Sequence, residues 1–199
     1  MNNLIQQQAP SFTTDAVLEN GKLSKISLSD FKNKKNVCLF FYPLNFTFVC
    51  PSEILSFSNK AHEFVARNVQ LLGISVDSQF SHLAWRNTSI ANGGIGAINF
   101  PLLSDITKKI AKNYGVLIDD SIALRGTFVI NKDGIIKHIS LNDLPIGRNV
   151  DEVIRIIDAM QHVEQSGHVC PAGWRKGLSS IEPTQTGIAS YLRDNASSL

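Results

Sequence analysis

Cys50 and Cys170 stand in segments of this 199-residue chain that could support redox chemistry. Cys50 is followed by Pro51, where a helical pattern begins after an apolar run, so its thiol is expected at a helix N-terminus. Unpaired backbone N–H groups and the positive end of the helix dipole favour a thiolate there. Because a helix terminus contributes only about 0.3–1 kcal/mol, a reactive thiolate also needs a cation or hydrogen-bond donors. Thr47, three residues before Cys50, is a side-chain donor close in the sequence.

The residues around these two cysteines resemble two signatures of the peroxiredoxins. In FYPLNFTFVCPSEI, Pro43, Thr47 and Cys50 are similar to the proline, threonine and peroxidatic cysteine of the family's active-site signature. The segment HVCPAGW, residues 168–174, resembles the resolving-cysteine segment of the typical 2-Cys subgroup, which includes the alkyl hydroperoxide reductase peroxidase subunits. The resemblance extends from about Ala9 to the C-terminus.

The resemblance implies a thiol-dependent peroxidase that reduces hydrogen peroxide and organic hydroperoxides. Cys50 would attack the peroxide and become a sulfenic acid, and Cys170 would condense with it to a disulfide between two chains. Arg125, in the block ALRG, matches the family arginine that stabilises developing negative charge together with Thr47. Pro43 matches the proline that shields the thiolate.

The resemblance also implies partners for the site and for the whole chain. Glu53 and Arg148 match family positions that hold the site arginine by charge pairing. A homodimer with two-fold symmetry is implied, with assembly to a decamer. Because the disulfide must be reopened, a thiol reductant is required, and thioredoxin or a flavoprotein disulfide reductase would serve. No cofactor, metal, nucleic acid or membrane is expected.

Two other functions on the same fold stay open at this point. A thiol–disulfide oxidoreductase normally carries two cysteines two residues apart, and no C-x-x-C occurs in this sequence. A holdase chaperone is the second alternative, and the sequence does not exclude it as an additional role. A metal site is disfavoured because the five histidines are scattered without ligand spacing. The remaining cysteine, Cys38, lies within an apolar strand pattern and is expected to be inert.

The elements that must position these residues alternate between strands and helices. Apolar runs predict strands at 37–42, 69–76, 126–130 and 135–140, the first two in a parallel strand–helix–strand unit and the last two in a hairpin with an Asp-Gly turn. Helical spacing and capping residues predict helices that begin near Cys50, Ser78, Asp105 and Asn149. An N-terminal hairpin that turns at Gly21 precedes them. This succession predicts an α/β, thioredoxin-like fold with an N-terminal hairpin extension, which is also the fold that the resemblance implies.

For two of these helices, the sequence also predicts which side chains face the core. In the Cys50 helix, the apolar side chains on one face are Ile54, Phe57, Ala61, Phe64 and Val65. In the Asp105 helix, they are Ile106, Ile110, Ala111 and Tyr114, and Gly115 closes the helix.

From Ser166 onward, the composition changes to Gly, Pro, Ser and Thr with short apolar breaks. This change predicts a mobile C-terminal tail, so we expect a peroxidase domain at 1–165 and a tail that carries Cys170 at 166–199. A helix-terminal thiol and a tail thiol rarely reach the Cα separation of about 4.4–6.8 Å that a disulfide requires without movement. We therefore expect the first turn of the Cys50 helix and the tail to unfold locally in each cycle.

The composition fits a soluble globular protein. A hydrophobic content of 43% with 18% charged residues argues against disorder, and a net charge of +2 with scattered lysines and arginines argues against a nucleic-acid partner. No apolar run approaches the roughly 18 residues that span a bilayer. The N-terminus, MNNLIQQQAPSF, lacks the pattern of a secretory signal, so we expect a cytoplasmic location.

Three positions depart from the family pattern. Asn45 stands where an aspartate is most usual, which removes a charge near the site. Residues 93–96 read GGIG where overoxidation-sensitive members carry GGLG, and Tyr191-Leu192 replaces their Tyr-Phe. Such features slow the unfolding of the Cys50 helix and leave the sulfenic acid longer for a second peroxide to reach. Because both are present in altered form, we expect intermediate sensitivity to overoxidation.

Overall fold

A computed structural model describes residues 3–198, and the chain divides into two compact units, Met1–Val150 and Asp151–Leu199. The strands of the first unit are β1 (Thr13–Val17), β2 (Leu23–Ser27), β3 (Asn36–Phe41), β4 (Val69–Ser75), β5 (Leu102–Ser104), β6 (Leu117–Ile118), β7 (Ile122–Ala123), β8 (Arg125–Ile130) and β9 (Ile136–Asn142). Its helices are α1 (Cys50–Asn59), α2 (Ala61–Ala66), α3 (Gln79–Asn87) and α4 (Lys109–Asn113), with short 3-10 helices η1 (Leu28–Phe31) and η2 (Ile90–Asn92).

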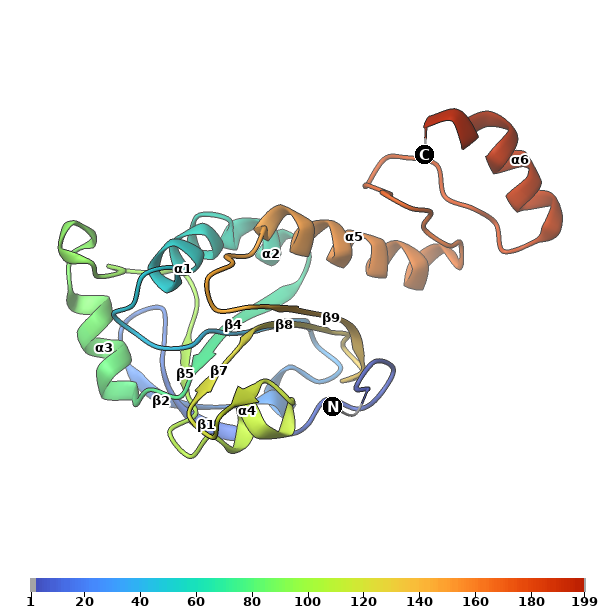
Figure 1. Ribbon diagram of the computed structural model, residues 1–199. Helices are drawn as coiled ribbons and strands as arrows, with labels where there is room; N and C mark the ends of the chain where they lie inside the picture. The colour runs from blue at the N-terminus through green and yellow to red at the C-terminus, as the bar shows by residue number, and fades with distance from the viewer. Residues whose placement is uncertain (1–2, 199) are drawn as a thin grey trace. The chain divides into compact units, whose positions relative to one another are not determined.

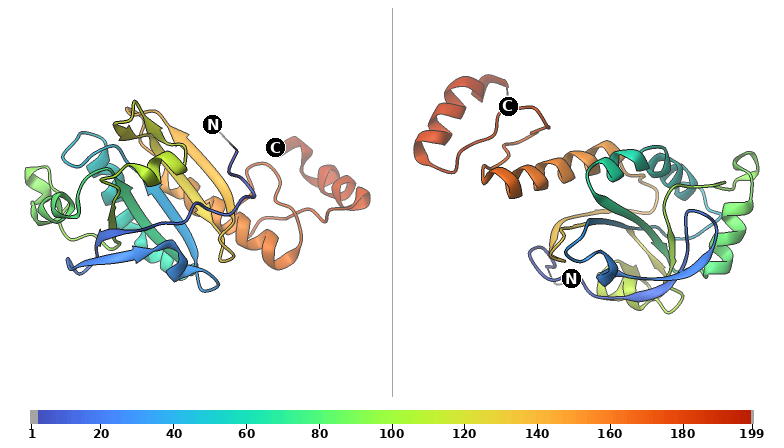
Figure 2. Two further views of the ribbon diagram at one scale, coloured as in Figure 1. Left: turned by 90° about the horizontal axis from the view of Figure 1, so that it is seen from below. Right: turned by 180° about the vertical axis from the view of Figure 1, so that it is seen from behind.

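The first unit is built on a seven-stranded sheet with the order β2-β1-β5-β4-β3-β8-β9 (Figure 1). Strand β3 pairs in parallel with β4 and antiparallel with β8, which confirms the expected parallel strand–helix–strand unit that carries Cys50. The predicted pair β8–β9 and the N-terminal hairpin β1–β2 are also present as antiparallel pairs. The hairpin forms one edge of the sheet (Figure 2).

Helices cover both faces of this sheet because β3 is apolar on both sides. Val37, Leu39 and Phe41 alternate toward a core shared with α4. On the other face, the Phe40 ring stacks on that of Phe57 in α1, with the ring centroids 4.2 Å apart. Figure 1 shows α1 and α2 on one side of the sheet and α4 on the other. These layers confirm the predicted α/β, thioredoxin-like class.

The helical segment after Cys50 differs from the prediction at one position. Ile54, Phe57, Ala61 and Phe64 are buried as expected, but Val65 is 74% exposed. Helix α1 ends at Asn59, and Lys60 has a φ of −101° and a ψ of 9°. This break shifts the helical phase, so α2 turns Val65 toward solvent.

The helix predicted from Asp105 is shorter than expected. Lys108 has a φ of +60°, and α4 begins only after it, which leaves Ile106 outside the helix and 63% exposed. The N-cap residue is Lys108 and not Asp105, but the Asp105 carboxylate still accepts first-turn backbone N–H groups, those of Ile110 at 3.1 Å and Ala111 at 2.7 Å. Gly115, with a φ of +69°, follows the helix as predicted.

The second unit consists of helix α5 (Val150–Ser166), which begins at the unit boundary, helix α6 (Gln185–Asn195) and the short η3 (Ala196–Ser198). Between the helices, Val169 and Ile181 form an antiparallel bridge. The prediction of an irregular tail missed α6, whose apolar residues are few. Thr184 caps α6 by accepting the N–H of Gly187 at 2.9 Å. The mobility of the tail and a domain boundary at 165 stay predictions.

Residues 3–198 contain no helix that is both long enough and apolar enough to cross a bilayer.

We expect Gly73→Ala to destabilise the first unit. A Cβ at this position of β4 would lie 2.9 Å from Leu102 Cδ2 and from Phe40 Cζ, so packed side chains would have to move. Overpacking of this kind costs about 1–3 kcal/mol, which urea unfolding would measure. Ser24→Ala on the exposed edge strand β2 is the control and should change the free energy of unfolding by less than about 0.5 kcal/mol. Equal stability of Gly73→Ala and the control would contradict this packing.

Candidate active site

Cys50 is the first residue of α1, in the turn that follows strand β3. Val49 precedes the helix, and Pro51 occupies the first turn, where its missing N–H would have had no helical partner. The Cys50 side chain is 0% exposed, and the thiol is free. The thiol thus lies at a helix N-terminus, as predicted, and it is buried.

Arg125 supplies a cation to this thiol. It is the first residue of β8, and its Nη1 lies 3.3 Å from Cys50 Sγ. Its Nε donates to Leu144 O at 2.6 Å, which fixes the direction of the guanidinium. A charge-assisted hydrogen bond from a guanidinium favours the thiolate form of sulfur.

Glu53 joins Arg125 to a second arginine, Arg148. One Glu53 oxygen, Oε2, accepts from Arg125 Nη1 at 2.7 Å and from Arg148 Nη2 at 2.8 Å. The other, Oε1, accepts from Arg148 Nε at 2.8 Å and from its backbone N–H at 2.9 Å. Burial would raise the pKa of Glu53, but the hydrogen bonds and charge of Arg148, with the charge of Arg125, outweigh burial and lower it. Glu53 is therefore an ionised carboxylate clamped by two guanidiniums.

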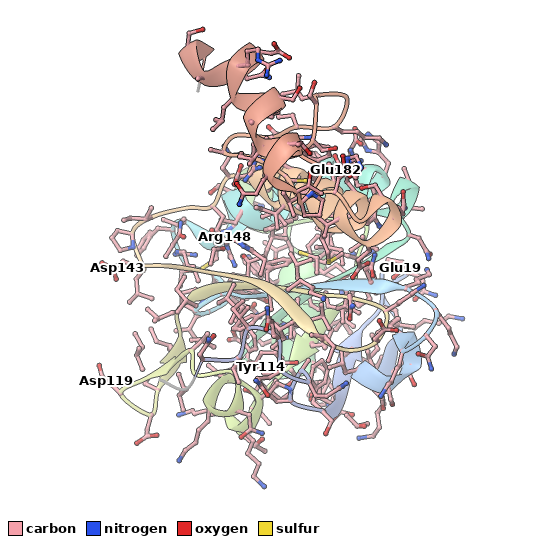
Figure 3. All side chains as sticks on the ribbon, turned by 90° about the vertical axis from the view of Figure 1, so that its right-hand side faces the viewer. Glu19, Tyr114, Asp119, Asp143, Arg148 and Glu182 are labelled. Carbon is pink, nitrogen blue, oxygen red and sulfur yellow. The ribbon has the colours of Figure 1, made fainter. Side chains whose placement is uncertain are left out.

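Arg148 also ties the carboxylate to the sheet. Its Nη1 donates to Phe41 O at 2.8 Å and to Gly126 O at 3.1 Å, which lie on neighbouring strands β3 and β8. Its guanidinium carbon lies 5.1 Å from the centre of the Phe40 ring and 5.8 Å from that of Phe57. Arg148 and Tyr114 lie on opposite sides of the sheet (Figure 3). These carbonyl and ring partners were not expected from the sequence.

Pro43 and Thr47 belong to the turn between β3 and α1. Pro43 is buried, and Thr47 is partly exposed, with its Oγ1 donating to Leu44 O at 2.9 Å. Phe46, between them, has a φ of +52°, which is strained for an aromatic residue. The turn is therefore held in an unusual backbone conformation close to Cys50 in sequence.

Asn45 anchors this turn through hydrogen bonds of its side chain and its backbone. Its Oδ1 accepts from Tyr42 Oη at 2.9 Å, its Nδ2 donates to Ser81 Oγ at 2.9 Å, and its backbone N–H donates to Asp77 Oδ2 at 2.9 Å. Its Nδ2 also lies 3.0 Å from His82 Nδ1. Both the oxygen and the nitrogen of the Asn45 side-chain amide thus have hydrogen-bond partners.

The other two cysteines have different surroundings. Cys38, in β3, is 0% exposed, and burial raises the pKa of its thiol to about 12, despite the charge of Arg148. Cys170 belongs to the second unit, where it is half-buried and its Sγ lies 3.7 Å from Ala159 O. Burial raises the pKa of Cys170, and the charge of Arg155 opposes that rise. Both thiols are protonated at neutral pH in this conformation.

Comparison with known proteins assigns the chain to a family. The family model described as the AhpC/TSA family matches residues 5–139. The chain belongs to the AhpC/TSA family of peroxiredoxins. A second model, described as the C-terminal domain of 1-Cys peroxiredoxin, matches residues 159–193 of this peroxiredoxin, the part that contains Cys170.

Similar proteins include named peroxide reductases. The peroxiredoxin is 45% identical to alkyl hydroperoxide reductase C of Helicobacter pylori, over 97% of this chain and 98% of that protein. It is 53% identical to the mitochondrial thioredoxin-dependent peroxide reductase of Mus musculus, over 94% of this chain and 72% of that protein. The reduced 2-Cys peroxiredoxin of Plasmodium vivax has a similar structure, with a TM-score of 0.95 and 50% identity over 96% of this chain and all of that chain.

The ionised Glu53 predicts a loss of stability in acid. Because its folded pKa lies below the ordinary value of 4.5, its contribution is complete above about pH 4.5 and is lost as the pH falls toward the folded pKa. Glu53→Gln leaves two buried guanidiniums undercompensated, so we expect a loss of about 3 kcal/mol at pH 7 that shrinks below pH 4.5.

Urea unfolding from pH 7 to pH 3.5 would measure this difference. The control is Glu63→Gln, which removes a partly exposed i,i+4 pair with Arg67 and should cost about 0.3–0.5 kcal/mol. A difference between wild type and Glu53→Gln that stays constant with pH would contradict the assignment of an ionised Glu53.

Proposed function

We propose that this peroxiredoxin, by its family a thiol-dependent peroxidase, reduces hydrogen peroxide and organic hydroperoxides at Cys50 and forms an intersubunit disulfide with Cys170. The observation that carries the proposal is the contact of 3.3 Å between Arg125 Nη1 and Cys50 Sγ. A helix terminus alone does not activate a thiol sufficiently, and Arg125 adds a cation next to Cys50, the cysteine that begins α1.

In the first step, the Cys50 thiolate attacks the nearer oxygen of the peroxide. An S–O bond forms as the O–O bond breaks, the sulfur is oxidised to a sulfenic acid, and the departing oxygen leaves as water or an alcohol after it takes a proton. Arg125 and the Thr47 hydroxyl stabilise the negative charge that develops on the departing oxygen, and Pro43 shields the thiolate from water. Glu53 and Arg148 hold Arg125 in place.

In the second step, Cys170 of a partner subunit condenses with the sulfenic acid. The enclosed position of Cys50 supports local unfolding, because a side chain that is 0% exposed in the first turn of α1 must emerge before a second sulfur can bond to it. An isologous dimer would place each Cys170 near the partner's Cys50.

The assembly of these dimers into a decamer is supported by surfaces that the chain leaves uncovered. Strand β9 is the last strand of the sheet; Gln6 and Gln7 pair with Ile136 at its start, and the rest of the strand forms an edge where a second copy could pair with it. Phe46, Phe48 and Phe80 are 54%, 98% and 64% exposed, which is unusual for aromatic side chains of a soluble protein. The ring centroids of Phe46 and Trp85 lie 5.7 Å apart, so part of this apolar surface connects the active-site turn with α3.

The reductant and the cellular location complete the proposal. Thioredoxin is favoured because a relative with 53% identity is named as a thioredoxin-dependent peroxide reductase, and a flavoprotein disulfide reductase is the other candidate. We propose a cytoplasmic location. Turnover assays with thioredoxin and with a flavoprotein disulfide reductase would decide between the two reductants, since only the physiological donor reopens the disulfide rapidly.

Arg125→Met should lower kcat/KM for peroxide by about 100–1,000-fold, because one donor to the developing charge is lost. Glu53 would keep its pairing with Arg148, so the first unit should stay folded. The matched control, Arg67→Met, removes a cation that pairs with Glu63 on α2 and should leave the rate unchanged. A small effect in Arg125→Met, with the fold intact by circular dichroism, would reject the assigned role.

Replacement of Cys50 and replacement of Cys170 should stop the peroxidase cycle at different steps. Cys50→Ser should consume no peroxide, whereas Cys170→Ser should still form one sulfenic acid per chain and then stop. On a non-reducing gel, peroxide-treated wild type should run as a covalent dimer and both variants as monomers. Peroxide turnover by Cys50→Ser would sink the proposal, while suppression of aggregation by this variant would reveal a separate holdase activity.

We expect intermediate overoxidation of this peroxiredoxin. Rising peroxide concentrations during turnover should convert part of Cys50 to the sulfinic acid, because a second peroxide competes with Cys170 for the sulfenic acid. Mass spectrometry of the Cys50 peptide measures the fraction converted. An absence of sulfinic Cys50 at high peroxide would count against the reading of the GGIG and Tyr191-Leu192 segments.

A further inference from the structure

In the second unit, the turn that follows Cys170 is attached to α5 through the side chain of Arg155. Arg155 Nη1 donates to Trp174 O at 2.9 Å. The Trp174 backbone N–H donates to Pro171 O at 3.2 Å, which closes the turn at 171–174. A hydrogen bond at Trp174 O therefore restrains the backbone that carries the second redox cysteine.

Glu152 orients the Arg155 guanidinium for this contact. Its two carboxylate oxygens accept from Arg155 Nε and Nη2, both at 2.7 Å. This fork occupies one edge of the guanidinium and directs Nη1 toward the turn. The side chains are 22% exposed for Arg155 and 52% for Glu152, so water can replace these bonds when the turn leaves.

The cysteine itself is held less firmly than the turn. Its Sγ lies 3.7 Å from Ala159 O, and a thiol is a weak donor. The Trp174 side chain is buried, with its ring centroid 4.8 Å from that of His162 and its Nε1 donating to Leu178 O at 3.1 Å. The contacts of Trp174 thus do more than those of Cys170 to keep the 170–174 turn folded.

We propose that Arg155 is a positioning residue for the second chemical step, whose bond to Trp174 O latches the 170–174 turn on α5 and limits how fast Cys170 reaches the oxidised Cys50. This inference rests on the function proposed above. In that step the Cys170 thiolate attacks the Cys50 sulfur, an S–S bond forms, the S–O bond breaks, and hydroxide takes a proton and leaves as water.

The latch also has a consequence for overoxidation. While the turn is latched, the Cys50 sulfenic acid waits, and a second peroxide can oxidise it further. Arg155 is thereby expected to set the ratio between disulfide and sulfinic acid, although it does not touch the peroxide in either reaction.

The test compares Arg155→Met with wild type. Reduced protein is mixed with one equivalent of hydrogen peroxide and quenched with a thiol-alkylating reagent, and the Cys50–Cys170 disulfide is followed by mass spectrometry. We expect the disulfide to form about tenfold faster in Arg155→Met, which corresponds to about 1.4 kcal/mol for the latch. The peroxide concentration that converts half of Cys50 to sulfinic acid should rise by the same factor, with sulfenic acid formation unchanged.

Two further variants separate the latch from other effects. Glu152→Gln keeps the Arg155 donor but weakens its orientation, so we expect a smaller acceleration in the same direction. Arg175→Met removes an exposed cation beside Trp174 and should behave as wild type. Hydrogen exchange of the backbone amides at 170–174 should be faster in Arg155→Met and Glu152→Gln but not in Arg175→Met.

Disulfide formation at the wild-type rate in Arg155→Met would overturn the proposal. A slower rate would overturn it too, because Arg155 would then assist the Cys170 thiolate instead of restraining it. If hydrogen exchange shows that Arg155→Met loses the fold of the second unit, Glu152→Gln decides by the same two criteria. Failure of the proposed function would look different, since wild type itself would then form no Cys50–Cys170 disulfide.

Discussion

The buried carboxylate of Glu53 is the interaction on which the rest of the site depends. Two guanidiniums, those of Arg125 and Arg148, meet this one carboxylate. The two guanidiniums carry two positive charges and the carboxylate carries one negative charge. The excess positive charge lies next to Cys50. A thiolate balances this charge, whereas a neutral thiol leaves two buried guanidiniums to share one carboxylate, which is expensive in a protein interior. The same arrangement therefore favours the reactive form of the sulfur.

This arrangement ties chemistry to the conformation of a single helical turn. Cys50 and Glu53 both belong to the first turn of α1, three residues apart. In the proposed cycle, that turn opens to release an oxidised Cys50, and Glu53 moves relative to the arginines, so the groups that favour the thiolate are disturbed once the sulfur has reacted. On this proposal, activation of the sulfur and its release depend on the same backbone turn and on the stability of its hydrogen bonds.

The sequence predicted those parts of the fold that depend on side-chain pattern. The apolar run that became β3 and the Asp-Gly turn between β8 and β9 were correct because period and turn chemistry are local. Val65 and Ile106 were misplaced because Lys60 interrupts one helix and Lys108, with a φ of +60°, delays another. Backbone angles at lysines leave no clear trace in the sequence. Helix α6 was missed because its few apolar residues give only a weak helical pattern, although Thr184 is a recognisable capping residue.

The site was predictable to a similar extent. A thiol at a helix terminus follows from Cys50 and Pro51 alone, but the choice of Arg125 came from the family resemblance and not from spacing. The partners that orient the arginines could not be predicted at all, since Leu144, Phe41 and Gly126 contribute only backbone carbonyls. Any residue type offers a carbonyl, so these contacts exist only once the strands are in register.

Cys38 shows how the fold confines oxidation to chosen sulfurs. Its thiol lies in the same unit as Cys50 and is equally buried, but with a pKa of about 12 it has almost no thiolate at neutral pH. A thiol in that state neither attacks a peroxide nor competes for the sulfenic acid, which protects the chain from an incorrect pairing inside its own core. In the proposed cycle, this leaves Cys50 and Cys170 as the reacting thiols among the three cysteines.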